Sequence, residues 1–393
     1  MVTKRRIKVA QVITRLDWGG SPDIVRILCT GLDPAIYDVR LIVGETLYPT
    51  EKTKQFLERF KDKITIIPQL RRNINLFFDA AAFFKLYFLF CKGRFDIIHT
   101  HTAKAGALGR LAAWLCGSPV IIHSSHGHNF YGYFSDFSSK IIIAIQRFLS
   151  CFTDKIIALT DLERQDFIRF KVAKEEKMCV IYQGLELDSY FYPAVNRSEM
   201  RKLFNINSDE FAVGMIARLE PIKGAIFFVE AASEVLKRHD KVKFIIVGEG
   251  SLRRALEDSV KALGLSGRFI FSGWREDIPA MMSMLDVLVL PSLNEAVGMV
   301  LVEAQASGVA VIGTKVGGVP EIIKDNENGL LVAPSNAPEI ARAVNILLED
   351  AQKRERFVKA GQEGLKKRFR AEAMIESISE LYVGLLSKKG HPA

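Results

Sequence analysis

Short apolar runs of strand length alternate with segments of helical periodicity along the whole chain. The runs are rich in β-branched residues and predict strands at residues 7–14, 39–43, 64–67, 96–100, 120–123, 156–159, 179–182, 212–216, 244–247, 269–271, 287–290, 309–312 and 330–332. Such alternation is typical of parallel sheets with helices on both faces. The chain is therefore predicted to be an α/β protein with two Rossmann-like sheets.

A chain of 393 residues is too long for one ordinary core, so two domains are expected. The boundary is expected near 192–198, where Pro193 and polar residues follow the last strand of the first half. The domains are predicted at 1–193 and 194–370. The remaining pattern is helical, with a last helix predicted at 371–387.

The stretch 286–321 combines a strand, a loop, a helix predicted at 298–306 and a second strand. Parallel sheets bind ligands outside the carboxyl ends of their strands, where helix N-termini attract phosphate. Glu295 precedes this helix and Glu303 lies inside it. Two carboxylates beside a phosphate site suit a ligand that also carries hydroxyls, such as a nucleotide-sugar. The alternative is a helix-capping Glu295 and a solvated Glu303.

Arg218 and Lys223 follow another predicted strand and precede Gly224, which opens a helix. A guanidinium can bind two phosphate oxygens and an ammonium adds a point charge, so this spacing suits a diphosphate. A surface ion-pair loop is the alternative.

Other strand ends carry weaker signals. Gly19 and Gly20 would let backbone approach a ligand or would simply form a tight turn. Gly248 and Gly250 lack the third glycine of a dinucleotide-binding fingerprint. Trp274 follows a strand, and an aromatic residue at this position could either pack in the core or stack on a nucleobase.

Histidines cluster at two strand ends and raise the question of a metal site. His123, His126 and His128 lack helical i, i+4 spacing, and no cysteine or carboxylate partners cluster beside them. No metal site and no cofactor are therefore expected.

Charge is concentrated in the first half of the chain. Residues 1–195 hold 27 Lys and Arg against 19 Asp and Glu, a balance of +8, out of +9 for the chain. An anionic partner is therefore expected, but the basic residues follow no nucleic-acid motif. An anionic membrane surface or a phosphorylated lipid fits better than nucleic acid.

The segment 76–91 carries only Asp79 and Lys85 as charges and follows Arg71 and Arg72. It is either a helix buried on all sides or a helix whose aromatic face lies on a bilayer. No apolar run reaches the ~18 to 20 residues that span a bilayer, and no signal peptide is recognisable. The odd set of five cysteines favours free thiols in a reducing compartment. A cytoplasmic protein is predicted, with peripheral contact on the inner face of the plasma membrane.

Four motifs occur in order on the ends of these strands: R-L-x-x-x-K-G at 218–224, V-G-x-G-x-x-R at 247–253, E-x7-E at 295–303 and G-G-x-P-E at 317–321. Together they resemble the family 4 retaining glycosyltransferases, which have the GT-B fold, and the resemblance covers nearly the whole chain. It implies two Rossmann-like domains whose parallel sheets face across a cleft. It also implies that a C-terminal helix at about 371–393 packs back on the first, acceptor-binding domain, while 194–370 binds the donor.

The resemblance further implies roles for individual residues. Arg218 and Lys223 would neutralise the donor diphosphate, and His126 and Glu295 would complete the catalytic set. His101 and Lys104 would border the acceptor, where a ligand phosphate would offset the unfavourable lysine at a helix start. The implied donor site comprises Gly19, Gly20, Arg218, Lys223, Gly248, Gly250, Trp274, Arg275, Glu295, Gly298, Met299, Val300 and Glu303.

The implied activity is metal-independent, retaining transfer of a sugar from a nucleotide-sugar, expected to be UDP-linked, to a lipid-linked or glycan acceptor in cell-surface polysaccharide biosynthesis. Two alternatives remain: a GT-B nucleotide-sugar 2-epimerase and a non-catalytic nucleotide-sugar-binding protein. The chain departs from the family pattern at Ala296 and Val297, where relatives have glycine shortly after the first glutamate. That departure predicts a differently shaped sugar pocket.

Overall fold

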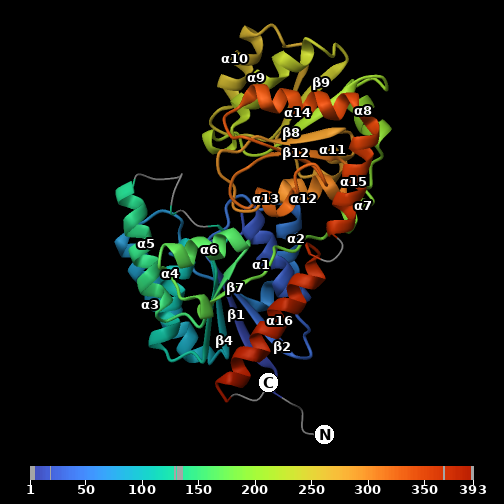
Figure 1. Ribbon diagram of the computed structural model, residues 1–393. Coiled ribbons are helices and arrows are strands. Elements are labelled where there is room, and N and C mark those ends of the chain that lie inside the picture. Colours follow the sequence, from blue (N-terminus) through green and yellow to red (C-terminus); the bar gives the residue numbers. More distant parts are fainter. Residues whose placement is uncertain (1–4, 18, 128–129, 131–135, 366–367, 391–393) are drawn as a thin grey trace. The chain divides into compact units, whose positions relative to one another are not determined.

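The structure is a computed structural model that describes residues 5–17, 19–127, 130, 136–365 and 368–390 (Figure 1). The chain divides into two compact units. The first combines Met1–Leu185 with Ala371–Ala393, and the second is Glu186–Arg370. The C-terminal helix α16 (Ala371–Lys388) thus belongs to the first unit, far from it in sequence.

The described part of the first unit forms a seven-stranded sheet of order β3-β2-β1-β4-β5-β6-β7, parallel throughout. Its strands are β1 (Ile7–Ile13), β2 (Tyr37–Val43), β3 (Ile64–Ile66), β4 (Ile97–His101), β5 (Val120–Ser124), β6 (Lys155–Ala158) and β7 (Met178–Val180). Its helices besides α16 are α1 (Gly20–Gly31), α2 (Glu51–Phe60), α3 (Leu76–Gly93), α4 (Ala103–Leu115), α5 (Asp136–Ser150) and α6 (Asp161–Arg169), with short 3₁₀ turns at Lys61–Lys63 and Glu175–Lys177. The strand order reverses between β1 and β4.

The second unit holds a six-stranded parallel sheet within its described residues, of order β10-β9-β8-β11-β12-β13. Its strands are β8 (Phe211–Ile216), β9 (Val242–Val247), β10 (Phe269–Gly273), β11 (Val287–Leu290), β12 (Ala310–Thr314) and β13 (Leu330–Val332). Its helices are α7 (Asp188–Phe191), α8 (Arg197–Leu203), α9 (Ala225–Leu236), α10 (Arg253–Ala262), α11 (Ile278–Ser283), α12 (Met299–Ala306), α13 (Val319–Ile322), α14 (Ala337–Glu349) and α15 (Ala351–Leu365), with a 3₁₀ turn at Pro221–Lys223. This is the strand order of a dinucleotide-binding Rossmann sheet, and it reverses between β8 and β11.

The two Rossmann-like parallel sheets predicted from the sequence are confirmed. Every predicted strand is present. Most of the strands are buried, and a strand buried on both faces reads as a short continuous apolar run. The main core of the second unit illustrates this: Phe228 of α9 packs edge to face on Phe244 of β9, which stacks on Phe269 of β10. Helix α1 begins at Gly20, directly after its cap at Gly19.

Helix α3 buries only one of its faces. Ala82, Leu86 and Phe90 recur every four residues and are buried. Phe77, Phe84 and Phe88 lie on the opposite side and remain 88%, 55% and 65% exposed. The alternative of a helix buried on all sides is therefore wrong. Within the described residues no helix is both long and apolar enough to cross a bilayer.

Candidate active site

The candidate donor site lies where the strand order of the second sheet reverses. Arg218 and Lys223 follow β8, and Glu295 follows β11, the neighbouring strand on the other side of the reversal. Helices that follow such a pair of strands lie on opposite faces of the sheet, which opens a crevice at the strands' carboxyl ends. The sequence motifs at 218–224 and 295–303 therefore flank one crevice.

An ion pair joins these two motifs directly. The Lys223 ammonium nitrogen lies 2.6 Å and 2.7 Å from the two carboxylate oxygens of Glu295. The two side chains are only 17% and 12% exposed. Charge-assisted bonds of this length in a partly buried setting are strong, so each residue fixes the position of the other.

Glycines allow the loops around this pair to pack against each other. Gly224 has φ of +64°, and a Cβ atom there would lie 2.1 Å from the Pro291 carbonyl oxygen. Gly317 has φ of +47°, and its Cβ would lie 1.6 Å from the carbonyl oxygen of Glu295. Neither position can accept a side chain without moving backbone, so the glycines of both motifs bring the site together.

The N-terminus of α12 faces the same end of the sheet. Gly298 caps it with φ of +85° and no capping side chain. No described residue accepts a hydrogen bond from the amides of Met299 or Val300, whereas Leu301 donates to the Gly298 carbonyl. Free amides and the positive end of a helix dipole together suit an anion. Glu303 lies one turn further along and is half-buried.

Arg218 is exposed, and within the described part of the chain no acidic side chain pairs with its guanidinium. It is therefore a cation available to a ligand, unlike Lys223, which Glu295 already engages. Gly248 and Gly250 lie beside it: Gly248 donates to the Gly273 carbonyl at 2.9 Å, and Leu219 donates to the Glu249 carbonyl at 2.9 Å. These hydrogen bonds join the loops after β8, β9 and β10 along one side of the candidate donor site.

Trp274 and Arg275 follow β10 but differ in availability. The guanidinium of Arg275 donates to both oxygens of Asp277, at 2.7 Å and 2.6 Å. These hydrogen bonds hold the pKa of the Asp277 carboxyl below its usual range. Trp274 is 42% exposed and offers an open aromatic surface on this side of the candidate donor site.

In the first unit, the sheet also reverses between β1 and β4, and the sequence-predicted residues follow these two strands. Gly19 caps α1 after β1, and Gly20 accepts a hydrogen bond from Gln183 at 3.3 Å. His101 ends β4, and Lys104 lies in the first turn of α4. The Lys104 ammonium is already paired: it donates to Asp79 at 2.6 Å and also to the Asn73 carbonyl, so a ligand phosphate there would have to compete with Asp79. Asp79 thus offsets the misfit of a lysine at a helix start.

Histidine side chains form a buried polar cluster at this end of the first sheet. His101 Nδ1 lies 2.9 Å from His126 Nε2, and His101 Nε2 lies 2.7 Å from Gln11 Oε1. Burial lowers the pKa of His126 to about 4 and that of His101 well below its ordinary value. Both imidazoles are therefore neutral near pH 7.

Two residues in strained backbone conformations lie beside this cluster. His126 has φ of +55°, and Thr102 has φ of +64° with ψ of +163°. Such conformations cost non-glycine residues free energy and persist where surrounding contacts impose them. The buried carboxylate of Glu163 supplies those contacts around His126: one of its oxygens accepts from Ser125 Oγ at 2.6 Å and from the Gly127 amide at 3.0 Å.

Sequence reasoning missed three residues of this cluster: Gln11, Glu163 and Tyr382. Glu163 carried a readable signal, because Thr160 and Glu163 have capping-box spacing and the Thr160 hydroxyl accepts from the Glu163 amide at 3.1 Å. Gln11 was visible only as one of two polar positions, with Lys8, in a mainly apolar strand. Nothing in the sequence pattern connects Tyr382 with residues more than 280 positions away.

Among the described residues, no group of three or more His, Cys, Asp and Glu side chains is arranged to hold a metal ion. His128 lies outside the described residues. The nitrogens of His101 that would bind a metal are instead hydrogen-bonded to Gln11 and His126.

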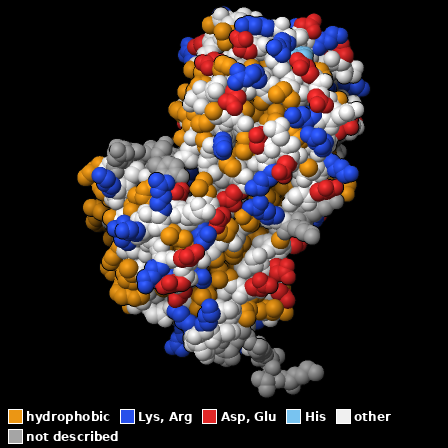
Figure 2. Space-filling view, viewed as in Figure 1, with side chains coloured by type: hydrophobic (Ala, Val, Ile, Leu, Met, Phe, Trp, Pro, Cys, Tyr) orange, Lys and Arg blue, Asp and Glu red, His pale blue; other side chains and the backbone are white. Residues whose placement is uncertain are grey.

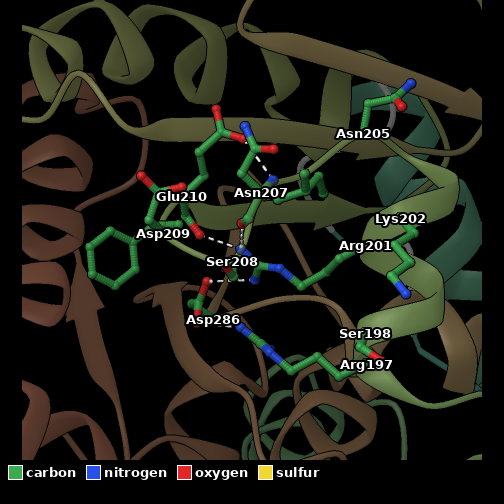
Figure 3. A pocket seen from close by; sticks show the side chains of 12 residues that line it. Arg197, Ser198, Arg201, Lys202, Asn205, Asn207, Ser208, Asp209, Glu210 and Asp286 are labelled. Atoms are coloured by element: carbon green, nitrogen blue, oxygen red, sulfur yellow. Dashed lines mark hydrogen bonds and ion pairs between the residues drawn. The ribbon is translucent and has the colours of Figure 1, made fainter.

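A cavity of about 830 Å³ in the second unit lies elsewhere, at the amino ends of β8 and β11 (Figure 3). Asp286 is the centre of its ionic contacts: it accepts from Arg197 at 2.7 Å and from Arg201 at 3.4 Å, and also binds the Ala212 amide at 2.8 Å. Arg201 is buried and donates to the carbonyls of Asn207 and Glu210. These contacts anchor α8 to the sheet, on the edge opposite the candidate donor site.

Comparison with known proteins agrees with this geometry. Residues 18–189 match the model of Glycosyltransferase Family 4, and residues 196–364 match that of Glycosyl transferases group 1. The crystal structure of Anabaena HepE in complex with UDP-glucose superposes with a TM-score of 0.82 at 24% identity, covering 96% of this chain and 100% of that one. Fold and site thus define a glycosyltransferase of the GT-B fold.

Curated relatives narrow the class to a family. The UDP-Gal:alpha-D-GlcNAc-diphosphoundecaprenol alpha-1,3-galactosyltransferase of Escherichia coli is 29% identical over 362 residues, 90% of each chain. The capsular polysaccharide biosynthesis glycosyltransferase CapM of Staphylococcus aureus is 25% identical over 83% of this chain and 86% of its own. The chain belongs to the family 4 glycosyltransferases, as its motifs had implied.

Proposed function

We propose that the protein is a retaining glycosyltransferase that moves a sugar from a UDP-sugar to a lipid-linked glycan acceptor in cell-surface polysaccharide assembly. One observation carries the proposal. Lys223 and Glu295 form an ion pair where the strand order of the second sheet reverses, and the uncapped N-terminus of α12 follows Glu295. This combination offers positive charge for a diphosphate and a carboxylate for sugar hydroxyls within one crevice.

In this proposal the second unit binds the donor. Arg218, Lys223 and the amides of Met299 and Val300 hold the diphosphate. Glu295 and Glu303 accept hydrogen bonds from sugar hydroxyls, and Trp274 packs near the base. Fixed cations and amides stabilise the charge that develops on the leaving diphosphate without reorganising during the reaction. Protein groups thereby supply the charge that a metal ion supplies in other transferases, so we expect no metal requirement.

The bond changes balance without a strong protein base. The bond from the anomeric carbon to the diphosphate oxygen breaks, and the acceptor hydroxyl oxygen forms its bond on the same face of the sugar. The departing diphosphate oxygen takes the hydroxyl proton. We assign His126 to a substrate hydroxyl, as the resemblance to the family implied.

The donor and acceptor chemistry draws support from the relatives. The Escherichia coli relative is named for a UDP-sugar and a diphosphoundecaprenol-linked sugar, and the Anabaena neighbour was crystallised with UDP-glucose. By this analogy we place a UDP-sugar on the second unit and a lipid-linked sugar on the first.

A lipid-linked acceptor requires access to a membrane, and the surface of the first unit suits one. Helix α3 exposes Phe77, Phe84 and Phe88 on one face. Helix α5 exposes an apolar stripe of its own at Phe137, Ile141, Ile145 and Phe148. Both helices pack against α4. We call these seven side chains the aromatic surface.

Basic residues accompany the aromatic surface. Figure 2 shows hydrophobic and basic side chains intermingled along the edge of the first unit where Figure 1 labels α3 and α5. Arg72 and Lys140 are exposed there. Each basic residue near an anionic bilayer contributes about 1 kcal/mol, added to apolar burial. We propose that this surface rests on the inner face of the plasma membrane.

Product analysis tests the proposed activity. Purified protein is incubated in EDTA with UDP-galactose, UDP-glucose or UDP-N-acetylglucosamine, with and without a diphosphoundecaprenol-linked sugar in detergent. The proposal expects UDP release and sugar transfer only when both substrates are present. Interconversion of the nucleotide-sugar without acceptor would identify a 2-epimerase instead. Binding without any turnover would identify a nucleotide-sugar-binding protein.

A further inference from the structure

A chain of hydrogen bonds runs from the C-terminal helix to His126. The Gln11 side-chain amide Nε2 donates to the Tyr382 hydroxyl at 2.9 Å. Gln11 Oε1 meets His101 Nε2 at 2.7 Å, and His101 Nδ1 meets His126 Nε2 at 2.9 Å. The four residues come from β1, α16, β4 and the turn after β5.

The direction of each bond follows from the orientation of the Gln11 amide, which places Nε2 at Tyr382 and Oε1 at His101. The amide oxygen of Gln11 can only accept, so His101 Nε2 carries a proton. A neutral imidazole has one N–H, so His101 Nδ1 is a lone pair and accepts a proton from His126 Nε2. His126 is also neutral, which leaves its Nδ1 without a proton.

The second branch of the network agrees with this direction. Because the Tyr382 oxygen accepts from Gln11, its own proton is available to His99 Nδ1 at 2.7 Å. His99 Nε2 then donates to Ser124 Oγ at 2.8 Å. Every proton is used once, and burial raises the pKa of the Tyr382 hydroxyl, so it stays protonated.

The hydrogen-bond chain ends at an acceptor, His126 Nδ1. His126 Nδ1 is buried and has no hydrogen-bond partner among the described residues. A buried acceptor without a partner is costly, and it is held here on a backbone that is itself strained. An unpaired acceptor on a strained backbone is a combination found at functional sites.

We infer that Tyr382, Gln11 and His101 are positioning residues that hold His126 in the tautomer with a bare Nδ1, ready to accept a hydrogen bond from a substrate hydroxyl. The identity of that hydroxyl as a sugar or acceptor group rests on the proposed function. The tautomer itself does not. The C-terminal helix thereby contributes to the site through a side chain that touches no substrate.

Nitrogen NMR of the full-length protein labelled with ¹⁵N-histidine tests the tautomer without any substrate. At pH 7.5 we expect His126 Nδ1, assigned by its loss in His126→Gln, to show the shift of an unprotonated nitrogen, and Nε2 that of a protonated one. A protonated Nδ1 would overturn the inference, whether or not the protein transfers sugar.

Tyr382→Phe keeps the ring but removes the hydroxyl that orients the Gln11 amide. We expect the His126 Nδ1 shift to move toward the protonated value and kcat to fall about tenfold, with KM for the nucleotide-sugar little changed, because one lost hydrogen bond to a substrate hydroxyl changes a rate by up to about this factor. Tyr37→Phe is the matched control: its hydroxyl meets Ser379 of the same helix at 2.7 Å but lies outside the chain. An unchanged nitrogen shift in Tyr382→Phe, or the same shift change in both variants, would contradict the inference.

Discussion

The ion pair between Lys223 and Glu295 predicts an unusual effect of one substitution. If the donor diphosphate binds Lys223, it must compete with a carboxylate that already holds the ammonium through contacts of 2.6 Å and 2.7 Å. Glu295→Gln removes the competing charge but keeps the shape of the side chain. We therefore expect this variant to bind UDP more tightly than the wild type, although it loses a proposed catalytic residue.

The magnitude follows from the geometry of the pair. Hydrogen bonds between charged groups contribute about 1.5–3 kcal/mol net to stability. Breaking a fully buried ion pair costs about 3–5 kcal/mol, and this pair should cost less because its side chains remain 17% and 12% exposed. The folded protein should lose about 1–3 kcal/mol of unfolding free energy. Release of Lys223 should tighten UDP binding by about 1.4 kcal/mol, a factor of ten in Kd.

Isothermal titration calorimetry with UDP in EDTA measures the affinity, and urea unfolding measures the stability. Asp209→Asn is the matched control, because Asp209 and Lys241 form a pair of 2.7 Å in the same unit, away from the candidate donor site. This control should leave UDP affinity unchanged. Equal or weaker UDP binding by Glu295→Gln would refute the competition, and with it the assignment of Lys223 to the diphosphate.

Three further predictions concern stability and membrane binding. Burial lowers the pKa values of the buried histidines, to about 3 for His99, so the unfolded chain binds more protons than the folded protein below pH 6.5. The unfolding free energy should therefore fall as pH is lowered, by about 1.4 kcal/mol per histidine between pH 7.5 and 5.5. In urea unfolding, His99→Asn should reduce the pH dependence of the unfolding free energy by about one proton. Gly224→Ala should cost about 2–4 kcal/mol of unfolding free energy, because the new Cβ would meet a carbonyl oxygen at 2.1 Å in a left-handed backbone; a loss below 0.5 kcal/mol would show that the loops adjust freely. Arg72→Glu should weaken co-sedimentation with anionic vesicles about tenfold or more, whereas Arg59→Glu on α2 should not; equal binding by both would remove the aromatic surface from the membrane proposal.

Much of the fold could be predicted because its signals are local. Each strand is a short apolar run, and a helix such as α12 begins directly after a glycine, Gly298, that ends the preceding loop. Residues at strand ends are also readable, since parallel topology gathers them at one edge. Arg218, Lys223 and Glu295 were found in this way.

The relations between distant residues were not readable. Lys223 and Glu295 lie 72 positions apart, and Gln11 and Tyr382 lie 371 apart, so no sequence window contains both partners. Local competition was missed for another reason. Arg275 suits a nucleobase loop by its position, yet Asp277, two residues away, accepts two hydrogen bonds from one edge of its guanidinium. Pairing depends on side-chain geometry that residue type alone leaves open.

The stereochemistry of the product tests the central claim most directly. Purified protein is given a UDP-sugar whose anomeric configuration is α, together with a diphosphoundecaprenol-linked acceptor, and the new linkage is read by NMR. The account predicts a single α-linked product formed in EDTA, with activity strongly reduced in Arg218→Met. A β-linked product, or release of free sugar with no transfer, would contradict it.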